Sequence, residues 1–342
     1  MGAEEDIAAP KPIETVRESG ELAMMVIGED QLRELVGEDE ALQAVETAFR
    51  ALADGRVVQP PPLGMDLERV QGEVHVKGAF LEGEPVFAMK VASGFYRNAE
   101  RGLPTGSGLV LVFDASTGFP LALLQDNAYL TELRTGAAGA LAVRLLTPDR
   151  PLKVAVLGAG SQARYQLRAI ARVRKIQGLR VWSPVPEEVA RYEAEMVGVL
   201  GVPVSGADSV EEAVSHADLV VTVTPARKPI LMLDWLARGA TVVAVGSDGP
   251  EKQELDPKIL GSAGKVVVDS RSQCLRLGET HHAVSAGILT PEGIHGELGE
   301  VLLGTRSGRE DEELIVCDLT GVGAQDAAMA GAVWSRLSAG EI

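Results

Sequence analysis

A short apolar run followed by a glycine turn is the clearest chemical feature of the sequence. Val154–Leu157 precedes Gly158-Ala159-Gly160-Ser161-Gln162-Ala163, a G-x-G-x-x-A turn that opens an amphipathic helix. In such a turn the first glycine permits the tight bend, the second lets the backbone approach a pyrophosphate, and the alanine allows close helix–strand packing. The helix N-terminus offers its N–H groups to the phosphates. We therefore expect Gly158, Ala159, Gly160, Ser161, Gln162 and Ala163 to bind a dinucleotide rather than to form a ligand-free turn.

The residue expected to contact the adenosine ribose is Ser183, which follows the second strand of the same region. An acid at this place holds the ribose hydroxyls of NAD and disfavours the additional phosphate of NADP. Serine does neither, and no arginine follows immediately. The cofactor is therefore NAD or NADP, and the missing acid slightly favours NADP.

Two cations are candidates for binding an anionic substrate. Lys90 stands among apolar residues on a predicted strand, where an ammonium is costly unless it is paired or functional. The alternative is a lysine whose stem packs while its head reaches water. Arg134 begins a helix of small residues and suits bidentate binding of carboxylate or phosphate, although a surface arginine would look the same. Lys77 shares a strand face with His75 and by itself indicates a solvated residue.

Asp248 follows an apolar strand of the middle region, where the carboxyl ends of parallel strands form a ligand crevice. A carboxyl group beside a nicotinamide could act as a general acid or base, whereas the plainer interpretation is a helix cap or turn residue. Further on, Thr320-Gly321-Val322-Gly323 either brings the backbone close to a cofactor or merely joins a strand to a helix. Besides the glycine turn and Ser183, we expect these residues to contact the cofactor: Thr135, Thr222, Thr224, Gly246, Ser247 and Gly321.

The elements that must position these residues change character along the chain. After a helix at 39–54, strand-like stretches at 73–80, 86–92, 108–114 and 119–125 predict an antiparallel β region, and an Ala-rich helix follows at 131–145. From Lys153 strands alternate with helices, which predicts a doubly wound parallel sheet. After about Gly308 the sequence resembles the first part again. We expect an α/β fold with a flexible tail (1–20) and a Rossmann domain (146–311) inserted into a domain made of 21–145 and 312–342.

Composition excludes several classes of function. The 342 residues carry a formal net charge of −17, which argues against nucleic acid and against an anionic membrane surface. We find neither a secretory signal nor an apolar run of membrane-spanning length. Cys274 and Cys317 are the two cysteines, so a disulfide framework is not expected and a reducing, cytoplasmic location is. His281 and His282 are adjacent without nearby thiols, and we expect no structural metal.

Taken together, these motifs resemble the ornithine cyclodeaminase/mu-crystallin family over nearly the whole chain from about Met25. The resemblance implies a homodimer in which a Rossmann domain is inserted into an α+β dimerisation and substrate domain. It implies that Lys90 and Arg134 bind the carboxylate of a small amino or imino acid, and that Arg134 also lies near the cofactor phosphates. It further implies that Asp248 is the catalytic carboxylate. The resemblance rests on Gly102–Thr105, Phe113–Gly118, Leu133–Ala138, Leu157–Ala163 and Gly246–Asp248 followed by Glu254-Leu255.

One segment departs from the pattern of this family. Its members often carry an arginine just after a Gln-Pro or Met-Pro pair, where the side chain grips the substrate carboxylate. Here the place reads Gln59-Pro60-Pro61-Pro62-Leu63, without arginine. We hypothesise that Lys77 supplies the missing cation for the substrate. Near the C-terminus, Gly278–His282 and Cys317–Gly321 are similar to a branch found with ectoine catabolism and to iminosuccinate reductases.

Three interpretations follow from the resemblance. In the first, NAD(P)H reduces the α-carbon of an imine once, as in an imine reductase or amino-acid dehydrogenase, with Asp248 and Lys90 as catalytic residues. In the second, catalytic NAD converts ornithine to proline and ammonia; the presence of Asp248 favours this reaction. The missing arginine and the C-terminal resemblance favour the first. The third, a binding protein without turnover, is disfavoured by the intact set of Lys90, Arg134 and Asp248.

Overall fold

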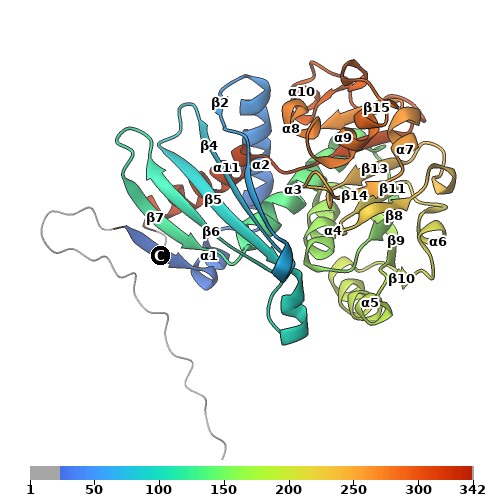
Figure 1. Cartoon of the computed structure of the whole chain (residues 1–342), viewed down its shortest axis with the longest axis horizontal. Coiled ribbons are helices and arrows are strands. Elements are labelled where there is room, and N and C mark those ends of the chain that lie inside the picture. Colours follow the sequence, from blue (N-terminus) through green and yellow to red (C-terminus); the bar gives the residue numbers. More distant parts are fainter. Residues whose placement is uncertain (1–23, 341–342) are drawn as a thin grey trace, which may run out of the picture.

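The computed structural model describes residues 24–340 and places two sheets side by side (Figure 1). The tail expected at 1–20 lies outside the described residues. The first sheet has the strand order β1-β7-β6-β5-β4-β2, with β3 paired to β4; β1 is parallel to β7 and the other neighbours are antiparallel. Its strands are β1 (Met25–Gly28), β2 (Val57–Val58), β3 (Leu63–Leu67), β4 (Gly72–Leu81), β5 (Val86–Phe95), β6 (Gly106–Asp114) and β7 (Pro120–Gln125).

Helices cover one face of this sheet. Helix α11 (Gly323–Ser338) packs on β4 and β5 and contacts α2 (Glu38–Ala53), which packs on α3 (Tyr129–Leu146); the short α1 (Glu29–Leu35) follows β1. Successive strand residues point to opposite faces, so alternate positions are buried. Most of the buried positions carry small or medium apolar side chains: Ala79, Leu81, Val86, Ala88, Val110, Val112, Ala122 and Leu124.

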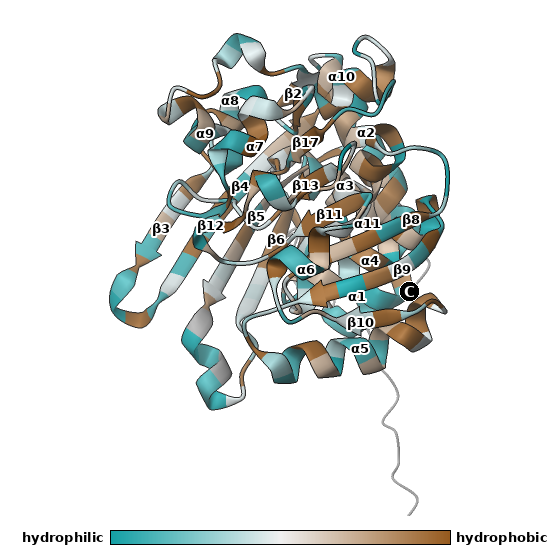
Figure 2. Ribbon diagram, turned by 90° about the vertical axis from the view of Figure 1, so that its right-hand side faces the viewer, coloured by the Kyte–Doolittle hydropathy of each residue, from teal (hydrophilic) through white to brown (hydrophobic). Residues whose placement is uncertain are grey.

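The second sheet is parallel throughout and has the order β10-β9-β8-β11-β13-β17-β15-β16. Its central strands are buried on both faces, which explains their near-continuous apolar sequences and their brown colour in Figure 2. The order reverses between β8 and β11, the place where doubly wound sheets bind ligands. The strands are β8 (Leu152–Leu157), β9 (Ile176–Trp182), β10 (Val204–Gly206), β11 (Leu219–Thr222), β13 (Thr241–Ala244), β15 (Lys265–Val268), β16 (Gly296–Glu297) and β17 (Ile315–Asp318).

The helices between these strands lie within the same half of the molecule as the parallel sheet (Figure 1). Helix α4 (Ser161–Val173) follows β8, and α5 (Pro186–Leu200) follows β9. A small separate pair, β12 (Arg227–Leu231) and β14 (Gln253–Leu255), lies at its side. The remaining helices are α6 (Val210–Val214), α7 (Pro257–Ser262), α8 (Arg271–Cys274), α9 (Gly278–Ser285) and α10 (Leu298–Leu303).

The structure moves one expected domain boundary. We expected residues from 312 onward in the first domain, but β17 pairs with β13 and β15 inside the parallel sheet. All four of its residues are buried, as a central parallel strand requires. The Ala-rich helix α11 that follows β17 does pack on the first sheet, so the sequence after about Gly308 resembles the first part although β17 belongs to the second sheet. The chain therefore returns to the first domain only after Asp318.

Helix α3 joins the two halves because its small residues allow a close approach. A Cβ on Gly136 would come within 2.7 Å of the Tyr165 carbonyl oxygen of α4, and one on Gly139 would overlap the Gln166 side chain. The small residues after Arg134 therefore serve helix packing. This places the N-terminal end of α3, with Arg134, at the junction of the two sheets.

Candidate active site

The glycine turn has the geometry that a dinucleotide requires. Gly158 has φ +116°, and a Cβ there would come within 2.9 Å of the Val223 carbonyl oxygen; its N–H donates to Trp182 O at 2.8 Å. Gly160 caps α4 without a side-chain hydrogen bond, and a Cβ there would meet nothing within 4 Å. The open space over Gly160 and the uncapped helix N-terminus fit a pyrophosphate.

The contrast between these two glycines gives a sharp prediction. Gly160→Ala is expected to leave the thermal stability of the free protein unchanged, because φ −81° suits alanine and the Cβ meets no neighbour. The methyl group should nevertheless stand where the pyrophosphate passes and raise the Kd for NADH by about tenfold or more. NADH fluorescence titration and calorimetry measure both quantities. Gly158→Ala, by comparison, should lower the melting temperature; an unstable Gly160→Ala protein would contradict the assignment.

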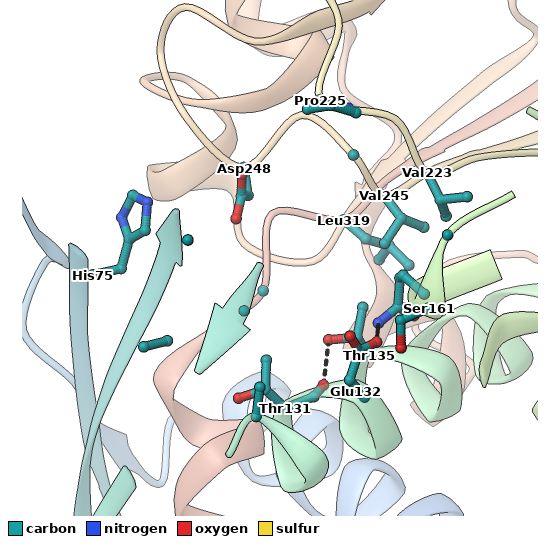
Figure 3. A pocket seen from close by; sticks show the side chains of 18 of the residues that line it. His75, Thr131, Glu132, Thr135, Ser161, Val223, Pro225, Val245, Asp248 and Leu319 are labelled. Carbon is teal, nitrogen blue, oxygen red and sulfur yellow. Dashed lines mark hydrogen bonds between the residues drawn. The ribbon is translucent and has the colours of Figure 1, made fainter. Parts of the chain in front are cut away.

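A cavity of about 360 Å³ lies between the two sheets and gathers many predicted residues (Figure 3). Figure 3 shows Thr135, Glu132 and Ser161 together at one end and Asp248 with His75 toward the other. Within residues 24–340, Lys77, Lys90, Gly158, Ala159, Ala163, Ser183, Thr222 and Ser247 are not part of its lining. The predicted residues that do line it are Arg134, Thr135, Gly160, Ser161, Gln162, Thr224, Gly246, Asp248 and Gly321.

Beneath the cavity, the three predicted cations surround a carboxylate that the sequence did not single out. Asp326 Oδ1 accepts hydrogen bonds from Lys90 Nζ at 2.9 Å and Arg134 Nε at 3.1 Å. Lys77, directly opposite Lys90 on β4 and β5, donates to Gly321 O at 2.8 Å. All four side chains are buried. Lys90 and Lys77 thus support Arg134 and the Gly321 turn, and Arg134 is the member that reaches the cavity.

Burial and charge shift the ionisation of this cluster. Burial and the positive charge of Arg134 lower the pKa of Lys90 to about 8, although Asp326 opposes the shift. The same two causes lower the pKa of Lys77. Burial raises the pKa of Asp326, but the charges of Lys90 and Arg134 outweigh it and hold the pKa below its usual value. The cluster therefore holds an ionised aspartate among cations near neutral pH.

Asp248 belongs to a second cluster, which crosses from one sheet to the other. Lys252 Nζ lies 2.7 Å from Asp248 Oδ1 and 2.9 Å from Glu73 Oε1 on β4. Burial raises the pKa of Asp248, yet the charges of Lys252 and Lys77 bring it below the usual range. Asp248 is thus an ionised carboxylate in the cavity. Sequence reasoning missed Glu73 and Lys252; the i, i+4 spacing of Asp248 and Lys252 was the available signal.

Three predicted cofactor contacts donate hydrogen bonds to one carboxylate of the protein itself. Thr222 Oγ1 donates to Glu254 Oε2 at 2.7 Å, and Thr224 donates its hydroxyl and its N–H to Glu254 Oε1 at 2.7 and 2.6 Å. Gly246 N–H also donates to Glu254, at 2.9 Å. Burial raises the pKa of Glu254 to about 7 despite these bonds. Glu254 therefore ties together the two loops that carry Thr224 and Asp248.

Other predicted residues have structural partners as well. The Ser247 hydroxyl donates to Lys252 O and so anchors the loop after Asp248. Ser183 lies at the end of β9, where its hydroxyl is 3.3 Å from Glu188 Oε2 of α5. Gly321 has φ +75°, its N–H donates to Asp269 Oδ2 at 2.6 Å, and a Cβ there would meet the Arg134 guanidinium at 2.6 Å. The Gly321 turn thus makes room for Arg134.

Residues 24–340 contain neither a metal-binding cluster nor a membrane-spanning helix. These residues hold no group of three or more His, Cys, Asp and Glu side chains arranged to bind a metal ion. In the same range, no helix combines the length and the apolar character that crossing a bilayer demands.

The sequence matches one known protein family over most of its length. Residues 23–341 match the model of the ornithine cyclodeaminase/mu-crystallin family. A putative dehydrogenase of Rhizobium meliloti is 42% identical over 93% of this chain and 97% of its own length. An iminosuccinate reductase of Paracoccus denitrificans is 32% identical over 91% of this chain and 95% of its own length.

Solved structures agree in fold over almost the whole chain. An archaeal alanine dehydrogenase dimer with bound NAD superposes with a TM-score of 0.86 at 35% identity, covering 93% of this chain and 97% of that one. The Δ(1)-pyrroline-2-carboxylate reductase of Thermococcus litoralis, in complex with NADH and L-proline, gives a TM-score of 0.88 at 30% identity, covering 93% and 98%.

Proposed function

Because the chain belongs to the ornithine cyclodeaminase/mu-crystallin family, we propose that it reduces small 2-imino acids to amino acids with NADH. One observation carries the proposal: a single cavity joins the dinucleotide turn, a buried arginine and an ionised aspartate. An arginine suits the substrate carboxylate, and an ionised carboxylate suits a positively charged iminium. The residues at the turn fit the dinucleotide described above.

Each residue has a defined task in this reaction. Arg134, fixed by Asp326 and Gln325, binds the C1 carboxylate and so sets the position of C2. Asp248 pairs with the protonated imine nitrogen and stabilises the electrophilic form of the C=N bond. NADH, when bound at the turn, supplies the hydride that C2 accepts. The C=N π bond breaks, its electrons stay on nitrogen, and the product leaves as the amino acid.

The reaction can be tested with imines made in solution. Oxidation of NADH is followed with pyruvate plus ammonium, oxaloacetate plus ammonium, and pyrroline-2-carboxylate. Net NADH oxidation with at least one of them is the expected result. Release of ammonia from ornithine with catalytic NAD⁺ and without net NADH would instead establish cyclodeamination. No turnover in either assay would favour a binding protein.

The cofactor is proposed to be NAD(H), in place of the slight preference for NADP drawn from the sequence. The side chain of Glu188 in α5 reaches Ser183, so its carboxylate lies at the end of β9. An acid at this place disfavours a ribose phosphate. Crystallised relatives carry NAD or NADH. The sequence pattern did not indicate this acid, because Glu188 stands five residues after Ser183, where the acid was expected.

A matched pair of variants checks this assignment. Glu188→Gln is expected to raise the kcat/KM ratio of NADPH to NADH by about tenfold, because one repulsive charge is removed. Glu187→Gln, an exposed neighbour in the same helical turn, serves as the control for net charge. Equal changes in both variants would show that Glu188 does not face the ribose.

A homodimer is proposed to form through the outer face of the first sheet. This face carries large, partly exposed side chains, and the Phe87 and Phe113 rings stack there at 4.9 Å. Met89, on the same face of β5 and opposite Leu111 of β6, is 39% exposed. Contiguous apolar surface of this kind is typical of an interface. The other side chains of the face are Val91, Leu109, Leu111, Leu121 and Leu123.

Sedimentation tests the dimer directly. The wild-type protein is expected to sediment at twice the 36.0 kDa of one chain. Met89→Lys puts a charge in the centre of the apolar face and should shift the protein toward monomers, whereas the same change at the remote, exposed Val199 should not. A monomeric wild-type protein would refute the interface.

A further inference from the structure

The imidazole of His75 has a buried nitrogen without a partner at the edge of the cavity. No hydrogen-bond partner for its Nε2 lies among residues 24–340, and the nearest carboxylate oxygen, Glu73 Oε1, is 3.9 Å away. His75 lines the cavity together with Asp248, and Figure 3 shows both at the same end. Buried polar atoms without partners are rare because they lose their bonds to water. A substrate atom in the cavity would supply the missing partner.

The proposed reaction requires a proton that no residue has yet been assigned to carry. Hydride addition to the protonated imine leaves a neutral amine with a lone pair on nitrogen, and this amine gains a proton to become the ammonium of the amino acid. In the reverse direction the ammonium has no lone pair, so it must lose a proton before C2 can release a hydride to NAD⁺. A group that exchanges a proton near neutral pH is therefore needed beside this nitrogen, and imidazole is the side chain that ordinarily does so.

The other titratable groups that line the cavity are unsuited to this exchange. Arg134 stays protonated in proteins. Asp248 and Glu73 both bind the Lys252 ammonium, at 2.7 and 2.9 Å, and the pKa of Asp248 lies below its usual range, so this carboxylate is a weak base. The two that remain accept hydrogen bonds from the glycine turns: Glu132 from Gln162 Nε2 at 2.6 Å and Asp269 from the Gly321 N–H at 2.6 Å.

The residues around His75 leave space for the substrate nitrogen between its ring and Asp248. Strand β5 presents only small residues here, with Ala92 opposite His75 and Gly94 opposite Glu73, and both line the cavity. The elements packed around His75 carry as many acidic as basic side chains, so both forms of the ring are compatible with this place. These charged residues are Glu73 and Lys77 of β4, Asp66 of β3, Lys90 of β5, and Asp248 and Lys252 of the second half.

We propose that His75 is the acid–base residue of the reaction, protonating the amine that hydride transfer forms and taking a proton from the ammonium in the reverse direction. The inference rests on the proposed function and adds the group that carries the proton. In the reductive direction the Nε2–H bond breaks, the proton binds the nitrogen lone pair, and the neutral ring regains a proton from water before the next turnover. Asp248 keeps its negative charge throughout and holds the substrate nitrogen beside His75.

Oxidation of amino acids by NAD⁺ from pH 6 to 10 tests this role. The substrates are L-alanine, L-aspartate and L-proline, the products of the three imines named above. His75→Gln should lower kcat/KM at pH 7 by about 100-fold or more. The deficit should shrink by about tenfold per pH unit, because solution then supplies the unprotonated amine that the variant cannot make. His216→Gln, an exposed histidine outside the cavity, should follow the wild-type profile.

Chemical rescue distinguishes proton transfer from positioning. His75→Ala leaves a space opposite Ala92, and added imidazole should raise the activity of this variant by about tenfold or more while leaving the wild type unchanged. A deficit of His75→Gln that is constant with pH, or a folded His75→Ala protein that does not respond to imidazole, would overturn the proposal while the reaction stands. A wild-type protein that neither reduces any of the imines nor oxidises any of the amino acids would refute the reaction itself, and this role with it.

Discussion

Replacement of Asp248 by asparagine is expected to lower kcat for imine reduction by about 10²–10⁴-fold and to leave the affinity for NADH unchanged. Asparagine keeps the shape but not the charge that stabilises the iminium. Lys252 retains Glu73 as a partner, so the loop should stay folded. Stopped-flow measurement of NADH oxidation gives the rate of the chemical step, and fluorescence titration gives the affinity.

The pH dependence provides a second check on Asp248. Since Lys252 and Lys77 hold its pKa below the usual range, Asp248 stays ionised from neutral pH well into the acid range. The wild-type kcat should therefore show no loss caused by Asp248 between pH 5 and 8. Lys252→Met removes the main cation and should move an acid limb upward toward that window. An unchanged kcat in Asp248→Asn would mean that this carboxylate does not face the substrate.

Local patterns in the sequence were sufficient for most elements and for the cofactor turn. The helix predicted at 39–54 is observed at Glu38–Ala53, because its periodicity and end signals lie within one short segment. The glycine turn could be predicted from an equally short segment, because its function depends on the backbone geometry of consecutive residues. Arg134 and Asp248 could be identified as candidates because they follow motif residues along the chain.

The partners of these residues could not be predicted. Lys90 and Asp326 are separated by 236 positions, and Lys252 and Glu73 by 179, so only the tertiary fold brings them together. For this reason the sequence could not show which group the Lys77 ammonium binds. On its strand it looks available for a substrate, but the fold directs its ammonium to the carbonyl groups of Thr320 and Gly321. Thr222 likewise meets Glu254, which comes from β14.

The second large effect is expected from Asp326→Asn, which should lower the free energy of unfolding by about 3–5 kcal/mol at pH 7. Asp326 is the buried anion between Lys90 and Arg134, and Lys77 lies nearby. Without its charge these cations repel one another in a place that water does not reach. The asparagine amide oxygen can still accept a hydrogen bond from Arg134 Nε, but without the charge this bond is weaker, so the KM for the imino acid should rise as well.

The response to pH distinguishes loss of charge from loss of packing. In the wild-type protein the pKa of Lys90 is about 8, below its ordinary value of 10.5, and removing Asp326 should lower it further. Between the folded and unfolded pKa values the unfolded chain binds more protons, so stability from this group rises with pH. In Asp326→Asn the folded and unfolded pKa values of Lys90 lie further apart, so the stability of the variant rises more with pH than that of the wild type. Urea unfolding at pH 7 and 9.5 should therefore show the deficit of Asp326→Asn shrinking at the higher pH.

Neutralising a cation together with the anion tests whether unbalanced charge causes the loss of stability. Lys90→Met combined with Asp326→Asn removes one charge of each sign, so the double variant should be more stable than Asp326→Asn alone although it carries one more substitution. Gln325→Ala, which removes the neutral acceptor of Arg134 Nη1, is the control for lost hydrogen bonding and should lack the pH response. If the deficit of Asp326→Asn were equal at both pH values, shape rather than charge would be the contribution of Asp326. Arg134 would then owe its position to the packing of α3 against α4 and α11.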